Sequence, residues 1–509
     1  MRRNGACAPR WRRLRSRGVP VLGGALLLLP LIAAACRRPP DPARLKDFNL
    51  IVINVDTLRA DHLGCYGYGR PTSPFVDRLA SEGVVFERAL SNSSYTRESV
   101  AVLESGRLPS CSGSVGWNAH PRAARPSLGR FFQNAAYRTG FFSVTPMLTH
   151  PEFAAGFGYV RQGWEAPDGF GRSGLGPRLS ALALAFVKPH AKEKLMMYLH
   201  YLDPHGPYEP SDESYHRLAP EPFPSPVALY KDLRPHFDSF LATGFGPGDR
   251  RFEDMVLRYD AEIADTDHAI ELLFQGLEEL HVLDHTLVLL TADHGEEFLE
   301  HGFIEHAWTL YGEVLHVPLI LWAPRALRPQ RSAVPAATVD VLPTILQLMQ
   351  IPYEPGDFDG RALLTRDGAV TPPARPYLGE LLLEERNVAR AVVADGWKYI
   401  AAQRWLTPAE RPRTAQVEDW QRAHGAVAPV DLAGPVVHEE LYHLADDPPE
   451  RHDLTASAPE QLATLRERLR EELAGCAQQR SVHGHGALRA EPLSPADAER
   501  LRSLGYLHE

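Results

Sequence analysis

Residues 49–62 of the chain are Asn-Leu-Ile-Val-Ile-Asn-Val-Asp-Thr-Leu-Arg-Ala-Asp-His. The largely apolar, β-branched run at 50–55 is typical of a buried central strand, and it ends at the carboxylate of Asp56. Ligands of open α/β sheets bind just beyond the carboxyl ends of the strands, which makes Asp56 a candidate metal ligand. Alternatively, Asp56 only caps the following turn. This stretch alone does not separate the two interpretations.

The rest of the chain alternates strand-like and helix-like segments. This alternation predicts an α/β fold with a large, mainly parallel central sheet and helices on both faces. The expected strands are 50–55, 140–145, 195–202, 286–291 and 317–322, and the expected helices are 74–82, 98–104, 126–136, 177–187, 251–279 and 337–349. Four acids in the longest helix, Asp260, Glu262, Asp265 and Asp267, are expected to form a solvated face rather than a metal cluster.

The texture of the sequence changes near residue 375, where short strand-like pieces are separated by turn residues and prolines. This predicts a small C-terminal α+β subdomain with an antiparallel sheet, followed by an amphipathic helix at 462–473. The expected boundaries are a linker at 37–47, a catalytic α/β domain at 48–370, the subdomain at 371–475 and a polar, helical tail at 476–509. The tail residues His483 and His485 are expected to be loop residues.

Residues 1–36 contain no acids. Their seven arginines are followed by an apolar run that ends Ala33-Ala34-Ala35-Cys36. A basic segment, an apolar core and small residues at the end describe a secretory signal. The ending resembles a bacterial lipobox, which implies lipidation at Cys36 and a protein tethered to the bacterial cell envelope. Simple cleavage and a retained anchor are the alternatives. One acyl-modified cysteine supplies a tether, not a span.

The charge and cysteine content exclude some classes of function. The net charge is −10, and removal of the seven N-terminal arginines would make it −17, which argues against binding to nucleic acids. The five cysteines form neither a disulfide framework nor a zinc pattern. A single bond between Cys65 and Cys111 is conceivable in an exported protein.

A second apolar strand, at 286–291, also ends near an acid and is followed by Asp293-His294-Gly295. Adjacent carboxylate and imidazole groups at a strand end can turn toward one divalent ion. Such a set suits Zn²⁺ or Mn²⁺, whereas a set richer in carboxylates suits Ca²⁺. Two such strand ends in one α/β body support Asp56, Asp293 and His294 as metal ligands.

A hydroxyl-rich loop at 91–99 runs into a helix whose N-terminus favours a bound anion. A Thr or Ser there, close to a metal, can act as a nucleophile, although Thr96 or Ser99 can also simply cap the helix. Two histidines in loops after strand-like segments, His205 and His306, stand where general acids and anion-binding groups belong, although isolated histidines are usually structural.

In order along the chain, these segments resemble the sulfatase branch of the alkaline phosphatase superfamily over about residues 48–460. The resemblance rests on Val-Asp-Thr-Leu-Arg-Ala-Asp-His-Leu-Gly-Cys-Tyr-Gly at 55–67, Arg-Pro-Thr-Ser-Pro at 70–74, Asp-His-Gly at 293–295, His-Gly at 301–302, His-Val-Pro-Leu-Ile at 316–320, Asp-Val-Leu-Pro-Thr at 340–344, Glu-Leu-Tyr at 440–442, Asp-Asp-Pro at 446–448 and Leu-Gly-Tyr-Leu at 504–507. It implies the α/β fold, one divalent metal ion and hydrolysis of a sulfate or phosphate ester.

The nucleophile loop departs from the family pattern. Formylglycine sulfatases carry Cys (or Ser)-x-Pro-Ser-Arg, and here Thr96 falls at the Cys position, Glu98 at the Pro, Ser99 at the Ser and Val100 at the Arg. Threonine cannot become formylglycine. A threonine nucleophile resembles related phosphodiesterases and phosphotransferases. Thr57 stands where a second carboxylate is expected, and the usual lysine near 140–150 is missing.

Carried over residue by residue, the resemblance implies that Asp56, Asp293 and His294 hold the metal and Thr96 attacks. His205, His306 and Ser99 would bind the ester group, and His205 or His306 would protonate the leaving oxygen. A second metal would have to draw on Asp203, His205 and His306, so one ion is expected. The expected partner is a small ester, or a sulfated or phosphorylated glycan or lipid headgroup. The alternative is a degenerate homologue that binds such a ligand without turnover.

Overall fold

The computed structural model describes residues 41–116, 119–121, 127–162, 174–219, 243–372, 375–383, 388–407 and 434–482. The chain divides into Met1–Pro39 and Pro40–Glu509, and the described residues all belong to the second unit. The predicted signal, the lipidation site Cys36 and the histidines at 483 and 485 therefore lie outside the described residues.

An eight-stranded sheet forms the centre of this unit, in the order β11-β2-β10-β7-β1-β6-β4-β5. The strand with the Asp56 carboxylate, β1 (Asn49–Val55), pairs in parallel with β6 (Leu195–Tyr201) and β7 (Thr286–Ala292). The other strands are β2 (Val84–Phe86), β4 (Arg138–Ser143), β5 (Tyr159–Gln162), β10 (Leu319–Trp322) and β11 (Gln330–Ser332). The large, mainly parallel sheet is thus confirmed, although β10 runs antiparallel to both of its neighbours.

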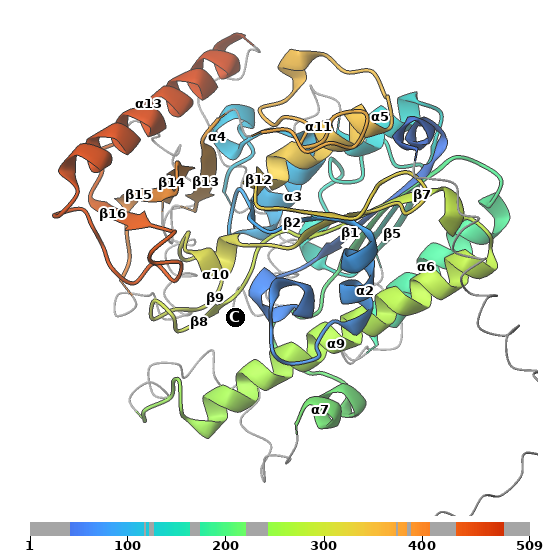
Figure 1. Ribbon diagram of the computed structural model, residues 1–509, viewed down its shortest axis with the longest axis horizontal. Helices are drawn as coiled ribbons and strands as arrows, with labels where there is room; N and C mark the ends of the chain where they lie inside the picture. Colours follow the sequence, from blue (N-terminus) through green and yellow to red (C-terminus); the bar gives the residue numbers. More distant parts are fainter. Residues whose placement is uncertain are drawn as a thin grey trace, which may run out of the picture. The chain divides into compact units, whose positions relative to one another are not determined.

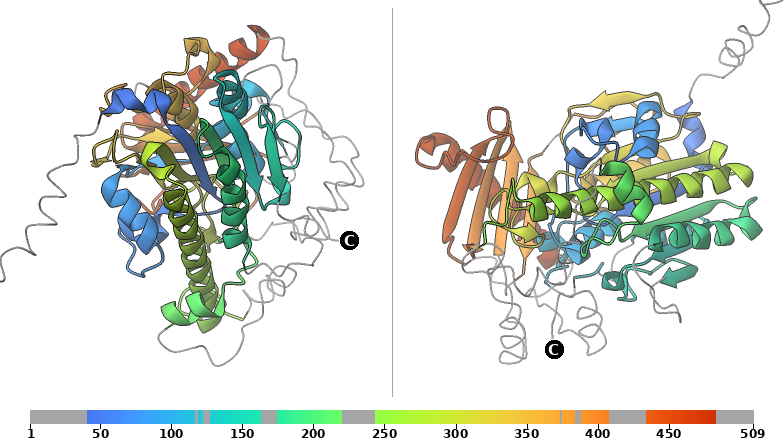
Figure 2. Two further views of the ribbon diagram at one scale, coloured as in Figure 1. Left: turned by 90° about the vertical axis from the view of Figure 1, so that its right-hand side faces the viewer. Right: turned by 90° about the horizontal axis from the view of Figure 1, so that it is seen from below.

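Helices cover both faces of this sheet, as predicted (Figures 1 and 2). Because side chains alternate along a strand, Ile51, Ile53 and Val55 pack on one face and Leu50 and Val52 on the other. The first face is covered by α2 (Pro74–Glu82), α6 (Leu175–His190) and α9 (Arg250–Glu279), and the second by α3 (Thr96–Ser105), α5 (Leu128–Asn134) and α11 (Val341–Leu348). The predicted helices therefore all occur, the one at 74–82 with the expected bounds and the others with shifted ends.

Short elements connect these layers. The helical ones are η1 (Pro42–Asp47), η2 (Ala60–His62), η3 (Gly64–Tyr66), α4 (Pro109–Ser112), η4 (Pro146–Leu148), α7 (Asp212–Leu218), η6 (Leu283–His285), α10 (Gly312–Leu315), η7 (Thr338–Asp340) and η8 (Pro355–Asp357). The extended ones are the pair β3 (Ala89–Leu90) and β12 (Ala336–Ala337) and the pair β8 (Glu297–Phe298) and β9 (Ile304–Glu305). In the described part of the chain, no helix is both long and apolar enough to cross a membrane.

The predicted C-terminal subdomain is a four-stranded antiparallel sheet. It contains β13 (Tyr377–Leu382), β14 (Val388–Ala394), β15 (Trp397–Arg404) and β16 (His438–His443) in that order. One face is covered by α13 (Pro459–Val482), which extends across the boundary expected at residue 476. The core of the subdomain also includes two residues from the helix that carries Thr96. Tyr95 directly precedes this helix and Val102 lies within it. The subdomain therefore supports the nucleophile loop directly.

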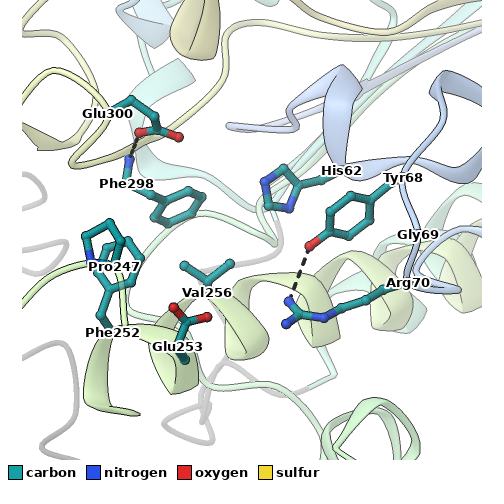
Figure 3. Close-up of a pocket in the computed structure, with 10 residues that line it drawn as sticks. All are labelled: His62, Tyr68, Gly69, Arg70, Pro247, Phe252, Glu253, Val256, Phe298 and Glu300. Carbon is teal, nitrogen blue, oxygen red and sulfur yellow. Dashed lines mark hydrogen bonds between the residues drawn. The ribbon is translucent and has the colours of Figure 1, made fainter. Parts of the chain in front are cut away.

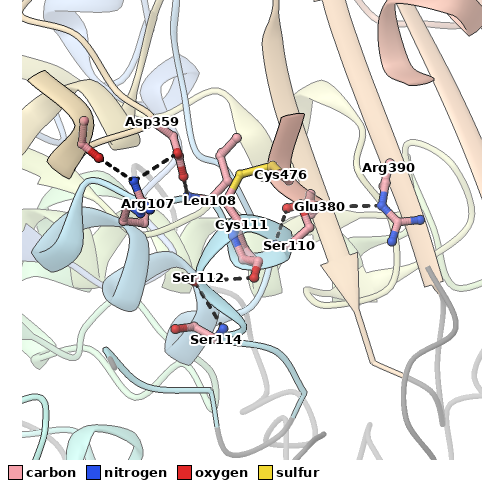
Figure 4. The surroundings of a disulfide bond; sticks show 12 residues. Arg107, Leu108, Ser110, Cys111, Ser112, Ser114, Asp359, Glu380, Arg390 and Cys476 are labelled. Atoms are coloured by element: carbon pink, nitrogen blue, oxygen red, sulfur yellow. Dashed lines mark hydrogen bonds and ion pairs between the residues drawn. A yellow bond between two sulfur atoms is a disulfide. The ribbon is translucent and has the colours of Figure 1, made fainter. Parts of the chain in front are cut away.

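A disulfide joins Cys111 of α4 to Cys476 of α13, and Cys65 is free, so the conceivable bond between Cys65 and Cys111 is not formed (Figure 4). The two bonded residues are 365 positions apart in the sequence. Beside the disulfide, Glu380 of β13 accepts a hydrogen bond from the backbone N–H of Ser110 and pairs with Arg390 of β14. Covalent and polar contacts thus tie the subdomain to the segment after the nucleophile helix.

The prediction that the acids of α9 form a solvated face is wrong. Asp260, Glu262 and Asp267 are buried, because each carboxylate accepts hydrogen bonds from another part of the chain. Asp260 receives them from His62 Nδ1 at 2.7 Å and from Tyr68 and Arg70 at 2.6 Å. Asp267 accepts from the first backbone N–H groups of α2, at 2.9 and 2.8 Å. These acids fasten neighbouring loops to the long helix.

Candidate metal and nucleophile site

Three neighbouring parallel strands bring the predicted metal ligands to one edge of the sheet. Asp56 follows β1, Asp293 and His294 follow β7, and His200 lies near the end of β6. One ligand atom from each of Asp56, His200 and Asp293 lies within 4.8 Å of the others, and all three residues are buried. The two carboxylates are close enough to share a single divalent cation, with His200 beside them.

The turn after Asp56 holds a strained residue. Thr57 has a φ of +54°, a left-handed conformation that a β-branched residue seldom adopts. Two hydrogen bonds hold it there: its N–H donates to Asp293 Oδ1 at 3.3 Å, and its carbonyl accepts from the Tyr259 hydroxyl at 2.8 Å. Although Thr57 brings no carboxylate, its backbone orients the carboxylate of Asp293.

The tautomer of His294 follows from its hydrogen bonds. Its Nδ1 lies 2.9 Å from the carbonyl oxygen of Gly295, which can only accept, so Nδ1 carries the proton. In the neutral ring, the Nε2 lone pair then faces the Thr96 hydroxyl at 3.1 Å, Asp293 Oδ2 at 3.6 Å and Asp56 Oδ1 at 3.9 Å. A histidine fixed in this way by a backbone carbonyl is arranged as a metal ligand.

The orientation of His200 is the opposite. Its Nδ1 lies 3.0 Å from the side-chain amide nitrogen of Asn54, which can only donate, and 3.4 Å from the Tyr198 hydroxyl. The proton therefore sits on Nε2, which donates to Asp56 Oδ2 at 3.3 Å. Burial lowers the pKa of His200 to about 4, so the ring is neutral. In this tautomer His200 orients Asp56.

One oxygen of Asp293 provides a direct test of whether an ion fits. Asp293 Oδ1 accepts from the backbone N–H of His294 at 2.9 Å, whereas the buried Oδ2 has no hydrogen bond within the described residues. A buried carboxylate oxygen without a partner is costly unless it coordinates a cation. Burial, and then the charge of Asp56, raise the pKa of Asp293 to about 6. A bound cation would offset both effects, so the residues present fit a metal ion.

Thr96 lies at the first residue of α3, fully buried beside these groups. Its hydroxyl is 3.1 Å from His294 Nε2. The helix has ten residues, and its free N–H groups and positive dipole end face the same edge. The structure thus brings Thr96 together with Asp56, Asp293 and His294, so that an oxygen nucleophile adjoins a cation site and a helix N-terminus.

Ser99 and Glu98 hold the nucleophile loop in shape. The Ser99 hydroxyl donates to the carbonyl of Ser93 at 2.7 Å and lies 3.1 Å from the Ser91 hydroxyl, which also bonds the carbonyl of Asp293. The Glu98 carboxylate accepts from the Ser93 hydroxyl at 2.8 Å and from the N–H of Gly116 at 3.1 Å. Burial raises the pKa of Glu98 to about 8, so it is mostly neutral at pH 7. A neutral Glu98 would not repel an anionic substrate.

Histidines continue outward from His294 in a row. The ring centroid of His306 lies 4.3 Å from that of His294 and 5.0 Å from that of His205. His306 Nδ1 is 2.9 Å from Glu296, and His205 Nδ1 donates to the carbonyl of Gly206 at 2.7 Å. The structure therefore brings both predicted histidines to the site.

Sequence reasoning missed two groups at this site, His200 and Glu296. His200 lies inside an apolar strand, where a histidine is usually a core residue. In the register of β1 and β6 it stands beside Asn54, and the strand order would have been needed to recognise this pairing. Glu296 lies three residues after Asp293, and burial followed by the charge of Glu305 raises its pKa well above the usual range. It aligns His306 and accepts from the Tyr208 hydroxyl at 3.0 Å.

A separate pocket of about 480 Å³ opens between η2, the loop after β8 and the start of α9 (Figure 3). The rings of His62, Tyr68, Phe252 and Phe298 line it together with Glu253. The ring centroids of Tyr208 and Phe298 lie 6.2 Å apart, and the Tyr208 hydroxyl donates a hydrogen bond to Glu296. This aromatic contact connects the pocket wall to the histidine row.

The Sulfatase family model matches residues 48–351, which is more than half of the chain. The chain belongs to the sulfatase family. Members of this family hydrolyse ester bonds and are generally dependent on a divalent metal ion, and the buried group at the strand ends is the corresponding candidate site. The sulfatase family thus accounts for the ordered motifs at residues 55–67, 293–295 and 316–320.

Two curated relatives show how far the similarity extends. The uncharacterized sulfatase YidJ of Escherichia coli is 25% identical over 347 residues, covering 60% of this chain and 69% of that protein. The N-acetylglucosamine-6-O-sulfatase of Bacteroides thetaiotaomicron is 23% identical over 443 residues, covering 70% and 78%. These relatives span most of the described fold.

Solved structures share the fold at low identity. A protein in complex with its substrate D-glucosamine-2-N,6-O-disulfate has a TM-score of 0.64 at 17% identity, covering 86% of this chain and 98% of that chain. The phosphonate monoester hydrolase of Agrobacterium radiobacter has a TM-score of 0.61 at 17% identity, covering 85% and 96%. One fold thus carries both sulfatases and a phosphonate monoester hydrolase.

Proposed function

We propose that this sulfatase-family hydrolase cleaves a sulfate or phosphate ester with Thr96 as the nucleophile and without formylglycine. The observation that carries the proposal is the position of the Thr96 hydroxyl, which lies 3.1 Å from a His294 nitrogen whose other ring nitrogen is committed to a backbone carbonyl. Asp56 and Asp293 complete the surroundings of that nitrogen. A merely capping threonine would need none of these groups.

One divalent ion would be held by Asp56, Asp293 and His294, with His200 fixing Asp56. When bound, the ion would favour the ionised form of the nucleophile and offset negative charge on the ester group. A donor set of two carboxylates and an imidazole favours Zn²⁺ or Mn²⁺ over Ca²⁺, which prefers six to eight oxygens. The absence of a second carboxylate at Thr57 supports the same choice.

The residues of the chain would divide the remaining work. The Thr96 hydroxyl would lose its proton to solvent, and its Oγ would bond to phosphorus or sulfur as the bond to the alcohol oxygen breaks. His205 or His306 would give the departing oxygen its proton. The N-terminus of α3 would stabilise the charge that develops on the transferred group. Attack of water on the covalent intermediate would then release sulfate or phosphate and restore Thr96.

The substrate class remains broad in this proposal: a small sulfate or phosphate ester, or such an ester on a glycan or lipid headgroup. The relatives support both chemistries, since one is an N-acetylglucosamine-6-O-sulfatase and a structural neighbour is a phosphonate monoester hydrolase. Because a threonine intermediate cannot collapse as a hydrated aldehyde does, turnover on either ester needs the final attack by water.

A binding protein without turnover is the second candidate. It is favoured by Val100 in place of the family arginine and by the absence of a cation from Phe141-Phe142-Ser143-Val144-Thr145. Both changes remove positive charge that would hold an anionic ester. The nucleophile–imidazole contact has no use in a pure binding protein, and for that reason we prefer the enzyme.

We also propose export and attachment to the cell envelope through a lipid on Cys36. The Cys111–Cys476 disulfide supports export, because disulfides persist mainly in oxidising compartments. Labelling with a fatty-acid analogue would test the attachment. Wild-type protein should incorporate the label, and Cys36→Ser should not.

The function is tested on purified protein by measuring bound metal and turnover of aryl sulfate, phosphate monoester and phosphodiester substrates. Thr96→Ala should reduce turnover by at least about 10³-fold, because little catalysis survives loss of a nucleophile. Thr96→Ser, which keeps the hydroxyl, should retain measurable turnover. Full turnover in Thr96→Ala would refute the nucleophile, and metal-free wild-type protein without turnover on any ester would support the binding protein.

A further inference from the structure

A second cavity, of about 550 Å³, lies between β12, the start of α11 and the C-terminal sheet. It shares no residue with the catalytic group. Four arginines line it, and they come from four separate parts of the chain: Arg88, Arg361, Arg375 and Arg468. No part of the proposed reaction uses this cavity, which we call the arginine pocket.

The arginine pocket carries more positive than negative charge. Arg375 pairs with Asp340 at 2.9 Å, and Arg468 pairs with Asp395 at 2.9 Å. Arg88 and Arg361 are exposed, and their side chains have no ion pair or hydrogen bond within the described residues. Two guanidinium groups without an ion pair in the described residues therefore line one cavity in a chain whose net charge is −10, although Arg361 also interacts electrostatically with Glu472. In an acidic protein such a local concentration of positive charge selects for anions.

We propose that the arginine pocket binds the tetrahedral oxyanion of sulfate or phosphate, either free or as an ester on a saccharide, at a site distinct from the catalytic centre. Guanidinium groups present paired N–H donors that match two oxygens of such an anion. The volume accommodates more than the anion alone, which leaves room for a sugar ring. The site does not depend on the proposed reaction, because none of its residues takes part in it.

The test is calorimetric titration of the metal-loaded full chain with inorganic sulfate, inorganic phosphate and a sulfated disaccharide. The double variant Arg88→Gln/Arg361→Gln removes the two unpaired charges at exposed positions. The matched control is Arg328→Gln, an exposed arginine outside the pocket. Turnover of a small aryl ester should stay within about twofold in both variants, because neither touches the catalytic groups.

In the wild-type protein and the control, we expect one anion site in addition to the catalytic one. In the double variant, that additional site should weaken by at least about tenfold, since two charge-assisted contacts are lost. Loss of disaccharide binding alone would identify the ester as the ligand, and loss for all three ligands would identify the shared oxyanion. Equal binding in the wild-type protein and the double variant, or a single site in the wild-type protein, would overturn the proposal.

Discussion

The ends of β1 and β7 and the long helix α9 each bury several carboxylates, but they satisfy them differently. On α9, Asp260 accepts hydrogen bonds from side chains of the segment between β1 and α2, and both oxygens of Asp267 accept from the first N–H groups of α2. At the strand ends, one buried oxygen of Asp293 has no hydrogen bond within the described residues. Acids whose hydrogen bonds are complete serve stability, and an acid with unused acceptor capacity indicates a place for a cation.

The largest difference between the two regions is expected when one carboxylate in each is replaced by an amide. Asp293→Asn should lose the metal and reduce turnover by at least about 10³-fold, with a small change in stability. Asp267→Asn should keep turnover but lower the free energy of unfolding by about 1–3 kcal/mol, because an amide cannot accept from both N–H groups of α2. Metal analysis, kinetics and denaturation of both variants check this. A reversed pattern would contradict the distinction.

Much of this arrangement could be predicted from the sequence, because strand ends are visible in it. Apolar runs ending at Asp56 and Asp293 identify two strands, and the parallel arrangement places their ends together. The antiparallel direction of β10 was not visible, since an apolar strand looks the same in either direction. The α9 acids were misread because a helical face rich in acids has the same periodicity whether water or hydrogen-bond donors cover it.

Contacts between residues far apart in the sequence could not be predicted either. The Cys111–Cys476 bond spans 365 positions, and only the folded backbone brings the two residues together. His200 was missed for a similar reason, because its role depends on Asn54, Tyr198 and Asp56 around it. Local patterns identify residues that stand at strand ends, whereas residues that act through a neighbour become visible only with the topology.

Within the site, replacing His200 distinguishes a residue that orients a metal ligand from a residue that binds the metal directly. His200→Gln should weaken metal affinity by about 10- to 100-fold, the usual effect of removing a group that orients a ligand. If His200 were itself a ligand, the loss would approach that of Asp293→Asn. Competitive titration with a metal-binding dye measures the difference. His294→Gln serves as the reference for loss of a direct ligand.

Glu104 on α3 is a third type of buried acid. Both of its oxygens lack hydrogen bonds within the described residues, and burial raises its pKa well above the usual range, so it is neutral. No other metal-binding side chain is grouped with it in the described part of the chain. Glu104→Met should therefore stabilise the protein by about 1–3 kcal/mol without loss of turnover. Thermal unfolding and kinetics check this. Loss of metal or turnover would assign Glu104 to the site.

Glu98 should make the stability of the protein depend on pH. Burial raises the folded-state pKa of Glu98 from its ordinary value of 4.5 to about 8, so the folded protein holds a proton that the unfolded chain releases between these values. Stability should therefore fall as pH rises from about 4.5 to 8, by at most about 1.4 kcal/mol per pH unit. Denaturation at several pH values should show a shallower slope in Glu98→Gln. Glu278→Gln, at an exposed position of α9, should keep the wild-type slope.

The central claim is that Thr96, placed beside the carboxylates at the strand ends, forms a bond to the transferred group. Rapid acid quenching of protein turning over an ester, followed by mass spectrometry of the peptide that contains Thr96, tests it most directly. We predict a phosphorylated or sulfated Thr96 in the wild-type protein, at higher occupancy early in turnover, and none in Thr96→Ala. Efficient turnover with no modification at Thr96 at any quench time, and with undiminished rate in Thr96→Ala, would contradict the account.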